Sequence, residues 1–160
     1  MKQVLLLRHA KSSWKHVVDD EFRPLNARGY RDAPVMAETL RGRLPDKILC
    51  SPSIRTYSTA MFYLRNRDMP LELLHLDWAL YEASGDRLMR YLLALDNSWQ
   101  SVWLFGHNPG LNELVELATG QAVDNIVTGA RVQLQWPVKD WQALQDGQAR
   151  LIGIDAPQKQ

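Results

Sequence analysis

The sequence predicts a three-layer α/β/α fold whose central sheet is mostly parallel and becomes antiparallel at a C-terminal edge. Short apolar runs at residues 4–7, 47–50 and 102–105 are typical of strands buried on both faces, and helical patterns of apolar residues separate them. Later in the chain, residues 132–136 alternate apolar and polar side chains, and a last strand is expected at 149–154. We expect these last two strands to form an antiparallel hairpin at one edge of the sheet.

The first helix is expected to begin after Asn26, whose side chain can cap it. Pro34 lies inside the helical pattern and should kink or divide the helix, and Pro45 should close it. Together with the strands on either side, this helix makes a βαβ unit with a right-handed crossover. The expected buried face comprises Ala33, Met36, Ala37, Leu40 and Leu44.

Three further helices are expected after turn signals. Ser53 should cap the second helix and Ser84 the third, while Gly120 should end the fourth. A third strand is expected at 71–76, and residues 141–144 can hold one helical turn. The positions expected to face the core are Tyr57, Ala60, Met61 and Leu64, then Leu88, Tyr91, Leu92 and Leu95, and finally Leu111, Leu114, Val115 and Ala118.

Length, charge and cysteine content exclude several classes of protein. The 160 residues suffice for one domain, expected over residues 1–155, with a tail at 156–160. A formal net charge of +1 does not indicate a nucleic-acid groove or a polybasic membrane surface. The first apolar run is too short for a signal peptide, and no stretch reaches transmembrane length. Cys50 is the only cysteine, so no disulfide framework is possible and a cytoplasmic location is expected.

Charged side chains follow three of the predicted parallel strands. Arg8 and His9 end the first strand, Arg55 lies in the first turn of the helix after the second, and His107 follows the 102–105 strand. Open α/β sheets bind ligands beyond the carboxyl ends of their strands, so these four side chains should meet at one edge. Arginine is a charged fork suited to phosphate, and histidine can act as nucleophile, acid or base. The pattern predicts a site for a dianionic phosphoryl group.

The sequence resembles the histidine phosphatase superfamily, also called the phosphoglycerate mutase-like fold. Four motifs carry the resemblance in the expected order: LRHAK at 7–11, RPLNARG at 23–29, SPSIRT at 51–56 and GHNPG at 106–110. The resemblance covers most of the chain, from about residue 2 to about residue 120. The motifs are most similar to those of the SixA-type phosphohistidine phosphatases.

This resemblance implies roles for individual residues. His9 would be the nucleophile that carries a transient phosphoryl group, while Arg8, Arg55 and His107 would hold the phosphoryl oxygens. Glu82 lies where the superfamily often has its proton donor. The implied enzyme is a metal-independent phosphatase without a cofactor, acting on a phosphohistidine-bearing protein or on a small phosphorylated substrate.

Other residues near the motifs have two possible interpretations. Asn108 is either a substrate ligand or a cap for the helix after Pro109. Lys11 either reaches the substrate or is a solvated lysine. Trp14 is expected at the mouth of the pocket, and Ala10 stands where the superfamily's first motif usually has glycine.

A cysteine phosphatase and a metal-dependent phosphatase are both disfavoured. The cysteine enzymes need five residues between cysteine and arginine, but only four separate Cys50 from Arg55, and Pro52 lies among them without a glycine. Cys50 is therefore expected to be a small buried residue. No cluster of Asp and His has metal-ligand spacing.

Two alternatives remain for the function. One is a small-molecule phosphomonoesterase or a mutase on the same scaffold, although the chain is short for the covering segments of a mutase. The other is a non-catalytic phosphoryl-binding module, which the presence of both histidines and both arginines argues against. The segment between Arg55 and Glu82 has room only for a helix and a strand, and so has the segment between Glu82 and His107. We therefore expect an open pocket that admits a side chain on a protein surface.

Overall fold

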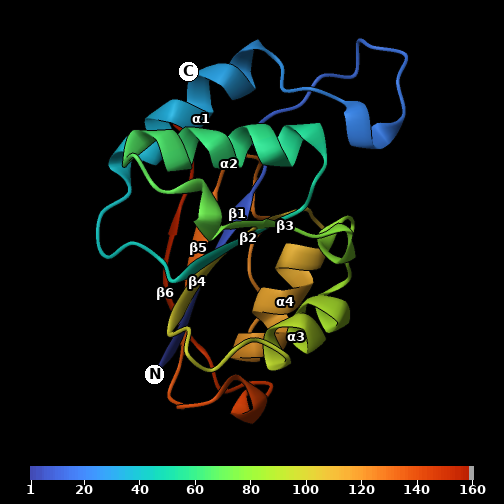
Figure 1. Ribbon diagram of the computed structural model, residues 1–160. Helices are drawn as coiled ribbons and strands as arrows, with labels where there is room; N and C mark the ends of the chain where they lie inside the picture. Colours follow the sequence, from blue (N-terminus) through green and yellow to red (C-terminus); the bar gives the residue numbers. More distant parts are fainter. Residues whose placement is uncertain (159–160) are drawn as a thin grey trace.

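The computed structural model describes residues 1–158, and within them the strands form one six-stranded sheet in the order β3-β2-β4-β1-β5-β6 (Figure 1). The first four strands of that order run parallel, and β5 and β6 pair antiparallel at the edge. The predicted α/β class and its antiparallel C-terminal hairpin are confirmed. The strands are β1 (Lys2–Arg8), β2 (Lys47–Cys50), β3 (Leu74–Leu76), β4 (Ser101–Gly106), β5 (Arg131–Trp136) and β6 (Arg150–Asp155).

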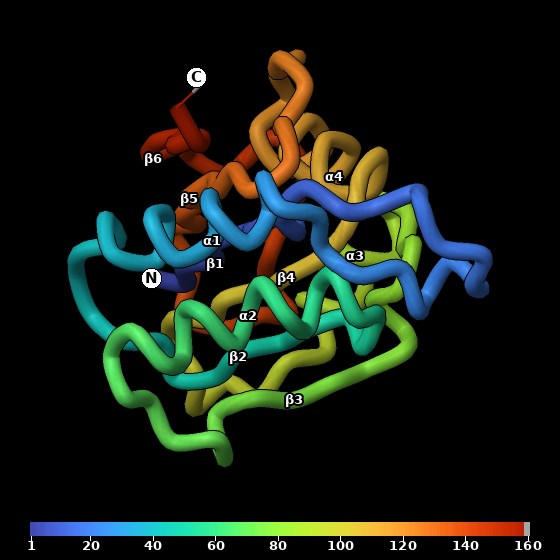
Figure 2. The backbone as a smooth tube through the Cα atoms, turned by 90° about the horizontal axis from the view of Figure 1, so that it is seen from above, coloured from blue at the N-terminus to red at the C-terminus, as the bar shows by residue number. Residues whose placement is uncertain are grey.

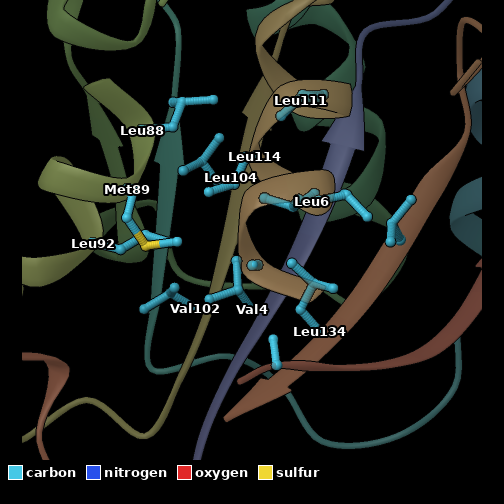
Figure 3. Packing of buried hydrophobic residues seen from close by; sticks show 14 of the residues in the cluster. Val4, Leu6, Leu88, Met89, Leu92, Val102, Leu104, Leu111, Leu114 and Leu134 are labelled. Atoms are coloured by element: carbon cyan, nitrogen blue, oxygen red, sulfur yellow. The ribbon is translucent and has the colours of Figure 1, made fainter. Parts of the chain in front are cut away.

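Helices α1 and α2 cover one face of this sheet, and α3 and α4 cover the other (Figure 1). Strand β1 contributes to both cores because alternate side chains of a strand point to opposite faces. Leu5 and Leu7 pack with α1 and α2, whereas Val4 and Leu6 pack with α3 and α4 (Figure 3). The bounds are Ala27–Thr39 for α1, Ile54–Asn66 for α2, Gly85–Leu93 for α3 and Gly110–Thr119 for α4.

Helix α1 begins as predicted but ends earlier. The side chain of Asn26 accepts a hydrogen bond from the Gly29 amide at 2.9 Å. Pro34 does not divide the helix, because burial of the α1 face outweighs the one hydrogen bond that proline removes. The predicted apolar face was too long: Leu40 is already the C-terminal cap, and Leu44 lies exposed in the connection to β2. Pro45 therefore does not close the helix.

Helix α2 turns a more polar face inward than the sequence predicted. Ser53 is the residue before the helix, but its hydroxyl bonds the Thr56 hydroxyl and not a backbone amide. Tyr57 and Met61 are only half-buried, and Tyr63 is buried instead, edge-on to aromatic rings of β4. The helix is rotated because its buried face also carries polar residues: Arg55, Thr56 and Thr59.

The remaining elements follow the predicted order with shifted ends. The strand expected at 71–76 is limited to β3, after a 3-10 turn at Leu71–Leu73, because its partner β2 offers only a short ladder. A 3-10 turn at Trp141–Ala143 matches the expected helical turn. Within the described residues, no helix is long and apolar enough to cross a membrane. Residues 159 and 160 of the expected tail lie outside the described residues.

The start of α3 and the end of α4 lie where the sequence predicted them. The Ser84 hydroxyl accepts from the Arg87 amide, as expected for the cap of α3. The buried positions of α3 are Leu88, Met89 and Leu92, and Tyr91 is half-buried. Gly120 ends α4 in the left-handed conformation with φ of +72°. All four predicted core positions of α4 are buried.

Gly110, the first residue of α4, lies directly against the backbone of the segment before α3. A Cβ added at Gly110 would come within 1.9 Å of the Ala83 carbonyl oxygen. This contact fixes the start of α4 beside Ala83, and only glycine fits there without a shift of one backbone. The last glycine of the GHNPG motif therefore has a packing role.

We predict that Gly110→Ala lowers the free energy of unfolding by about 2 kcal/mol or more, because the new methyl group overlaps backbone. Gly153→Ala is the control, since a Cβ there has no neighbour within 4 Å. Urea denaturation of both variants measures the difference. Equal losses in the two variants would contradict the close approach of α4 to residue 83.

Candidate active site

The side chains that were expected to meet at the carboxyl ends of the strands do meet there. Arg8 is the last residue of β1, His9 follows it, and His107 follows β4. The rings of His9 and His107 have centroids 5.4 Å apart. Arg55, in the first turn of α2, comes within 3.5 Å of His107 Nδ1. Three separate elements therefore bring two arginines and two histidines to one point.

These side chains line an open pocket of about 480 Å³. All seven residues singled out from the sequence contribute to its wall: Arg8, His9, Lys11, Arg55, Glu82, His107 and Asn108. Trp14 also lines the pocket, as expected, and its side chain is largely exposed. The remaining wall residues are Ser12, Asp20, Arg23 and Thr128.

His9 is held as a neutral imidazole with a free lone pair on Nε2. Its Nδ1 lies 2.8 Å from the Ala10 carbonyl oxygen, which can only accept, so Nδ1 carries the proton. Burial lowers the pKa of His9 to about 3, and the charges of Arg55 and Arg8 act in the same direction. The ring is therefore neutral at neutral pH, with Nε2 unprotonated.

A buried serine and a tyrosine ring fix the orientation of His107. Its Nε2 lies 2.8 Å from the hydroxyl of Ser51, which is fully buried. The Tyr81 ring packs edge-on to it, with centroids 5.4 Å apart. Burial is the largest cause that lowers the pKa of His107 to about 3, and the nearby His9 and Arg55 act in the same direction. Both site histidines are thus neutral rings with fixed orientations.

Arg55 is almost completely buried and is held by two acidic residues. Its Nη1 donates to the Asp20 carbonyl oxygen at 2.7 Å, and its Nη2 donates to the Asp20 carboxylate and to Glu82 Oε1, each at 2.9 Å. Arg8 is held through Nη1, which donates to the Ile126 carbonyl at 2.8 Å. The Nε atoms of both arginines have no acceptor among residues 1–158. Both guanidinium groups are therefore oriented by the scaffold and keep unused donors.

Glu82 reaches the site through an unusual backbone conformation. Its φ is +50°, in the left-handed region that non-glycine residues rarely adopt. Its carboxylate lies 2.9 Å from Arg55 Nη2 and 3.5 Å from His107 Nδ1. Strain of this kind concentrates at functional sites, where the surrounding structure holds it in place.

The two residues with two interpretations, Asn108 and Lys11, both line the pocket. The side-chain oxygen of Asn108, Oδ1, accepts a hydrogen bond from the Asn112 backbone amide at 3.1 Å. Its side-chain Nδ2 donates to the Ile126 carbonyl oxygen at 2.9 Å. Asn108 thus caps α4 and supports the loop that holds Arg8. The Lys11 side chain is exposed on the pocket wall.

Several residues of the site were not assigned a role from the sequence. Asp20 and Arg23 lie in the 11–25 segment, a long loop that extends outward from the end of β1 (Figure 2). This segment contains a 3-10 turn at Asp20–Phe22. Ser51 stands inside the SPSIRT motif and Tyr81 directly precedes Glu82, and their contacts with His107 depend on tertiary packing. No periodicity in the sequence marks any of them.

Cys50 lies apart from this constellation. It is fully buried at the end of β2, and burial raises the pKa of its thiol. Its Sγ donates to the Ser51 carbonyl at 3.2 Å. In the part of the chain that the structure describes, no three His, Cys, Asp or Glu side chains are placed to hold a metal ion.

The comparisons with known proteins agree with this geometry. Residues 4–84 match the histidine phosphatase superfamily (branch 1). The chain belongs to this superfamily. Its structure is similar to that of the putative phosphohistidine phosphatase SixA from Agrobacterium tumefaciens, with a TM-score of 0.82 and 26% identity over 98% of each chain.

Two further relatives extend over nearly the whole chain. The protein histidine phosphatase SixA complexed with tungstate shares the fold, with a TM-score of 0.82 and 23% identity over 97% of each chain. The uncharacterized protein MT1313 of Mycobacterium tuberculosis is 25% identical, over 94% of this chain and 99% of that protein. The superfamily predicted from the four motifs is therefore confirmed, and the roles of single residues stay predictions.

The low pKa values of the two histidines predict a loss of stability in mild acid. Free histidine titrates near pH 6.5, but His9 and His107 titrate at about 3 in the folded protein. Between these values the unfolded chain binds more protons, so the free energy of unfolding should fall as the pH drops from about 6.5 toward 3. The slope is at most about 1.4 kcal/mol per pH unit for each ring.

Denaturation curves at a series of pH values measure this slope. His107→Gln should make it shallower, because one of the two buried rings no longer contributes. His16→Gln replaces a histidine in an exposed loop and should leave the slope unchanged. A wild-type stability that stays flat from pH 7 to pH 4 would contradict the buried neutral state of both rings.

Proposed function

We propose that this protein is a metal-independent phosphatase that acts through a phosphohistidine at His9, and that its substrate is a phosphohistidine side chain on another protein. The observation that carries the proposal is the state of His9, a buried neutral imidazole with a free Nε2 beside two oriented arginines. Similarity to a putative phosphohistidine phosphatase of A. tumefaciens supports the same class of substrate.

In the first step, Nε2 of His9 attacks phosphorus and the bond from phosphorus to the leaving group breaks. Negative charge then spreads over the three equatorial oxygens of the phosphoryl group. Arg8 and Arg55 are placed to donate charge-assisted hydrogen bonds to these oxygens. His107 lies across the same space, 5.4 Å from the His9 ring. Because the scaffold already orients these groups, little reorganisation is needed as the charge develops.

In the second step, water attacks phosphorus and His9 is the leaving group. Phospho-His9 keeps its proton on Nδ1, which donates a hydrogen bond to the Ala10 carbonyl oxygen. The imidazole can therefore leave as a neutral ring without first acquiring a proton. The same hydrogen bond thus favours both formation and breakdown of the intermediate.

Glu82 is assigned as the proton donor for substrates whose leaving group is an oxygen. Its carboxyl group lies at the pocket between Arg55 and His107. An alkoxide is a poor leaving group, so alkyl phosphates depend on such an acid. A phosphohistidine depends on it less, because its phosphorus–nitrogen bond is labile.

Exposed apolar side chains around the mouth of the pocket support a protein as the substrate. The pocket is open, and large apolar side chains stand exposed in the segments around it: Trp14, Phe22, Trp78 and Val127 are exposed by 76%, 54%, 60% and 44%. Trp14 lines the pocket, and Val127 is next to the wall residue Thr128. A small metabolite would not cover such a rim, whereas a protein surface that presents a side chain would bury it.

The nucleophile is tested by His9→Ala, which should reduce turnover by at least about a thousandfold, because covalent catalysis is lost. Rapid quench of the wild type with labelled substrate, in buffer containing EDTA, should trap an acid-labile, base-stable phosphoenzyme. His16→Ala is the matched control and should keep full activity. Near-normal turnover in His9→Ala, or loss of activity in EDTA that magnesium restores, would refute the mechanism.

The rim is tested by the double variant Phe22→Ala/Val127→Ala. It should lower kcat/KM for a phosphohistidine-bearing protein by about tenfold through KM, because two exposed apolar contacts are removed. Hydrolysis of a small phosphoramidate should change by less than about threefold, since neither side chain reaches the inner site. Leu44→Ala, a comparably exposed residue in the α1–β2 connection, is the control. Equal losses on both substrates would contradict a protein partner at the rim.

A further inference from the structure

Asp20 is a second carboxylate in the pocket, and the proposed reaction leaves it without a role. It stands in the 3-10 turn of the outward loop and lines the same cavity as His9. Its Oδ1 accepts from Arg23 Nε at 3.0 Å, and its Oδ2 accepts from Arg55 Nη2 at 2.9 Å and from the Tyr81 hydroxyl. Its side chain is still 42% exposed, so one face remains open to a ligand.

These contacts fix the charge of Asp20. Burial acts against ionisation, but the hydrogen bonds from Tyr81, Arg55 and Arg23 outweigh it and hold the pKa of Asp20 well below its ordinary value. Asp20 is therefore a carboxylate throughout the neutral range and has no proton to give. It cannot share the task assigned to Glu82.

A permanent carboxylate suits the chemistry of a phosphoimidazole. Such a group leaves as neutral imidazole only when its distal ring nitrogen carries a proton, and in that state the ring is a cation. On the enzyme, the equivalent proton of His9 is held by the Ala10 carbonyl. The substrate ring lies on the far side of the phosphoryl group. It therefore needs a separate hydrogen-bond acceptor or a negatively charged protein group beside it.

We propose that Asp20 determines specificity for nitrogen-linked phosphoryl groups by stabilising the protonated imidazole ring of the substrate. In this step the Nε2 lone pair of His9 forms the new bond to phosphorus. The substrate's phosphorus–nitrogen bond breaks, and its electron pair stays on the ring nitrogen. The distal proton remains on the ring, so a neutral imidazole departs and no proton is transferred.

Asp20 can take this role because it lines the same cavity as His9 and shares Arg55 Nη2 with Glu82. Arg23 and Tyr81 also donate to its carboxylate and fix its position. A cationic leaving group in this cavity is attracted to this carboxylate. An oxygen-linked leaving group bears no positive charge and gains nothing from it.

The inference rests on the proposed function, and a purely structural role makes a different prediction. If Asp20 only orients Arg55, its loss weakens the grip on phosphoryl oxygens and slows every substrate by the same factor. If Asp20 stabilises the cationic ring, its loss slows nitrogen-linked substrates more. The ratio between substrate classes separates the two roles.

The experiment compares kcat/KM for phosphoimidazole, an aryl phosphate and an alkyl phosphate in four proteins: wild type, Asp20→Asn, Asp19→Asn and Glu82→Gln. Asp20→Asn should lower the ratio of kcat/KM for phosphoimidazole to kcat/KM for the aryl phosphate by about tenfold. This is the effect of lowering the pKa of the bound imidazole ring by one unit. Asp19→Asn removes the same charge from the exposed neighbouring residue and should leave the ratio unchanged. Glu82→Gln should show the reverse pattern, with the largest loss on the alkyl phosphate.

The outcomes are distinguishable. A wild-type protein that hydrolyses none of the three substrates would refute the proposed function itself. An active wild type with an equal loss on all substrates in Asp20→Asn would overturn only this inference and assign Asp20 to the positioning of Arg55. Far-ultraviolet circular dichroism of each variant confirms that the ratio is measured on folded protein.

Discussion

The parallel pairing of β1 with β4 is the constraint on which the site depends. Its register sets Arg8 opposite Gly106, so the next residue of each strand, His9 and His107, emerges at the same level. The His9 amide continues the ladder to the Gly106 carbonyl at 3.3 Å. A slip of one residue would turn one histidine to the other face of the sheet. Alternating burial of β1 in two cores prevents that slip.

The sequence predicted the part of the site that belongs to regular structure. Apolar runs locate the strands, and side chains beyond their ends must converge, so His9, Arg55 and His107 were identified without knowledge of the register. Asp20 was missed because its position depends on contacts between an irregular loop and Arg55, which no local pattern encodes. On α2, the predicted core positions Ala60 and Leu64 are buried, but Tyr57 and Met61 are only half-buried. The reason is related: Thr56 and Thr59 turn inward for polar contacts, against the pattern of apolar residues.

The second motif, RPLNARG, acts on the site through the backbone. The Asn26 amide donates to the Lys11 carbonyl, and a Cβ at Gly29 would come within 2.2 Å of the same oxygen. Helix α1 therefore begins in direct contact with the chain two residues beyond His9. Arg23 continues this attachment, because its guanidinium bonds Ser12 and lies 3.5 Å from the Trp14 ring. The loop is held at its base while its outer part stays exposed.

Two acidic side chains explain how the fold accommodates the buried guanidinium group of Arg55. An arginine in the interior needs acceptors, and Arg55 finds them in Asp20 and Glu82. These acceptors neutralise only part of the positive charge of the pocket, which also holds Arg8 and Arg23, while both histidines are neutral. The remaining positive charge suits a dianionic phosphoryl group, the ligand of the proposed function. The two carboxylates thus stabilise the buried guanidinium group, and in the proposed reaction Asp20 acts on nitrogen-linked leaving groups and Glu82 on oxygen-linked ones.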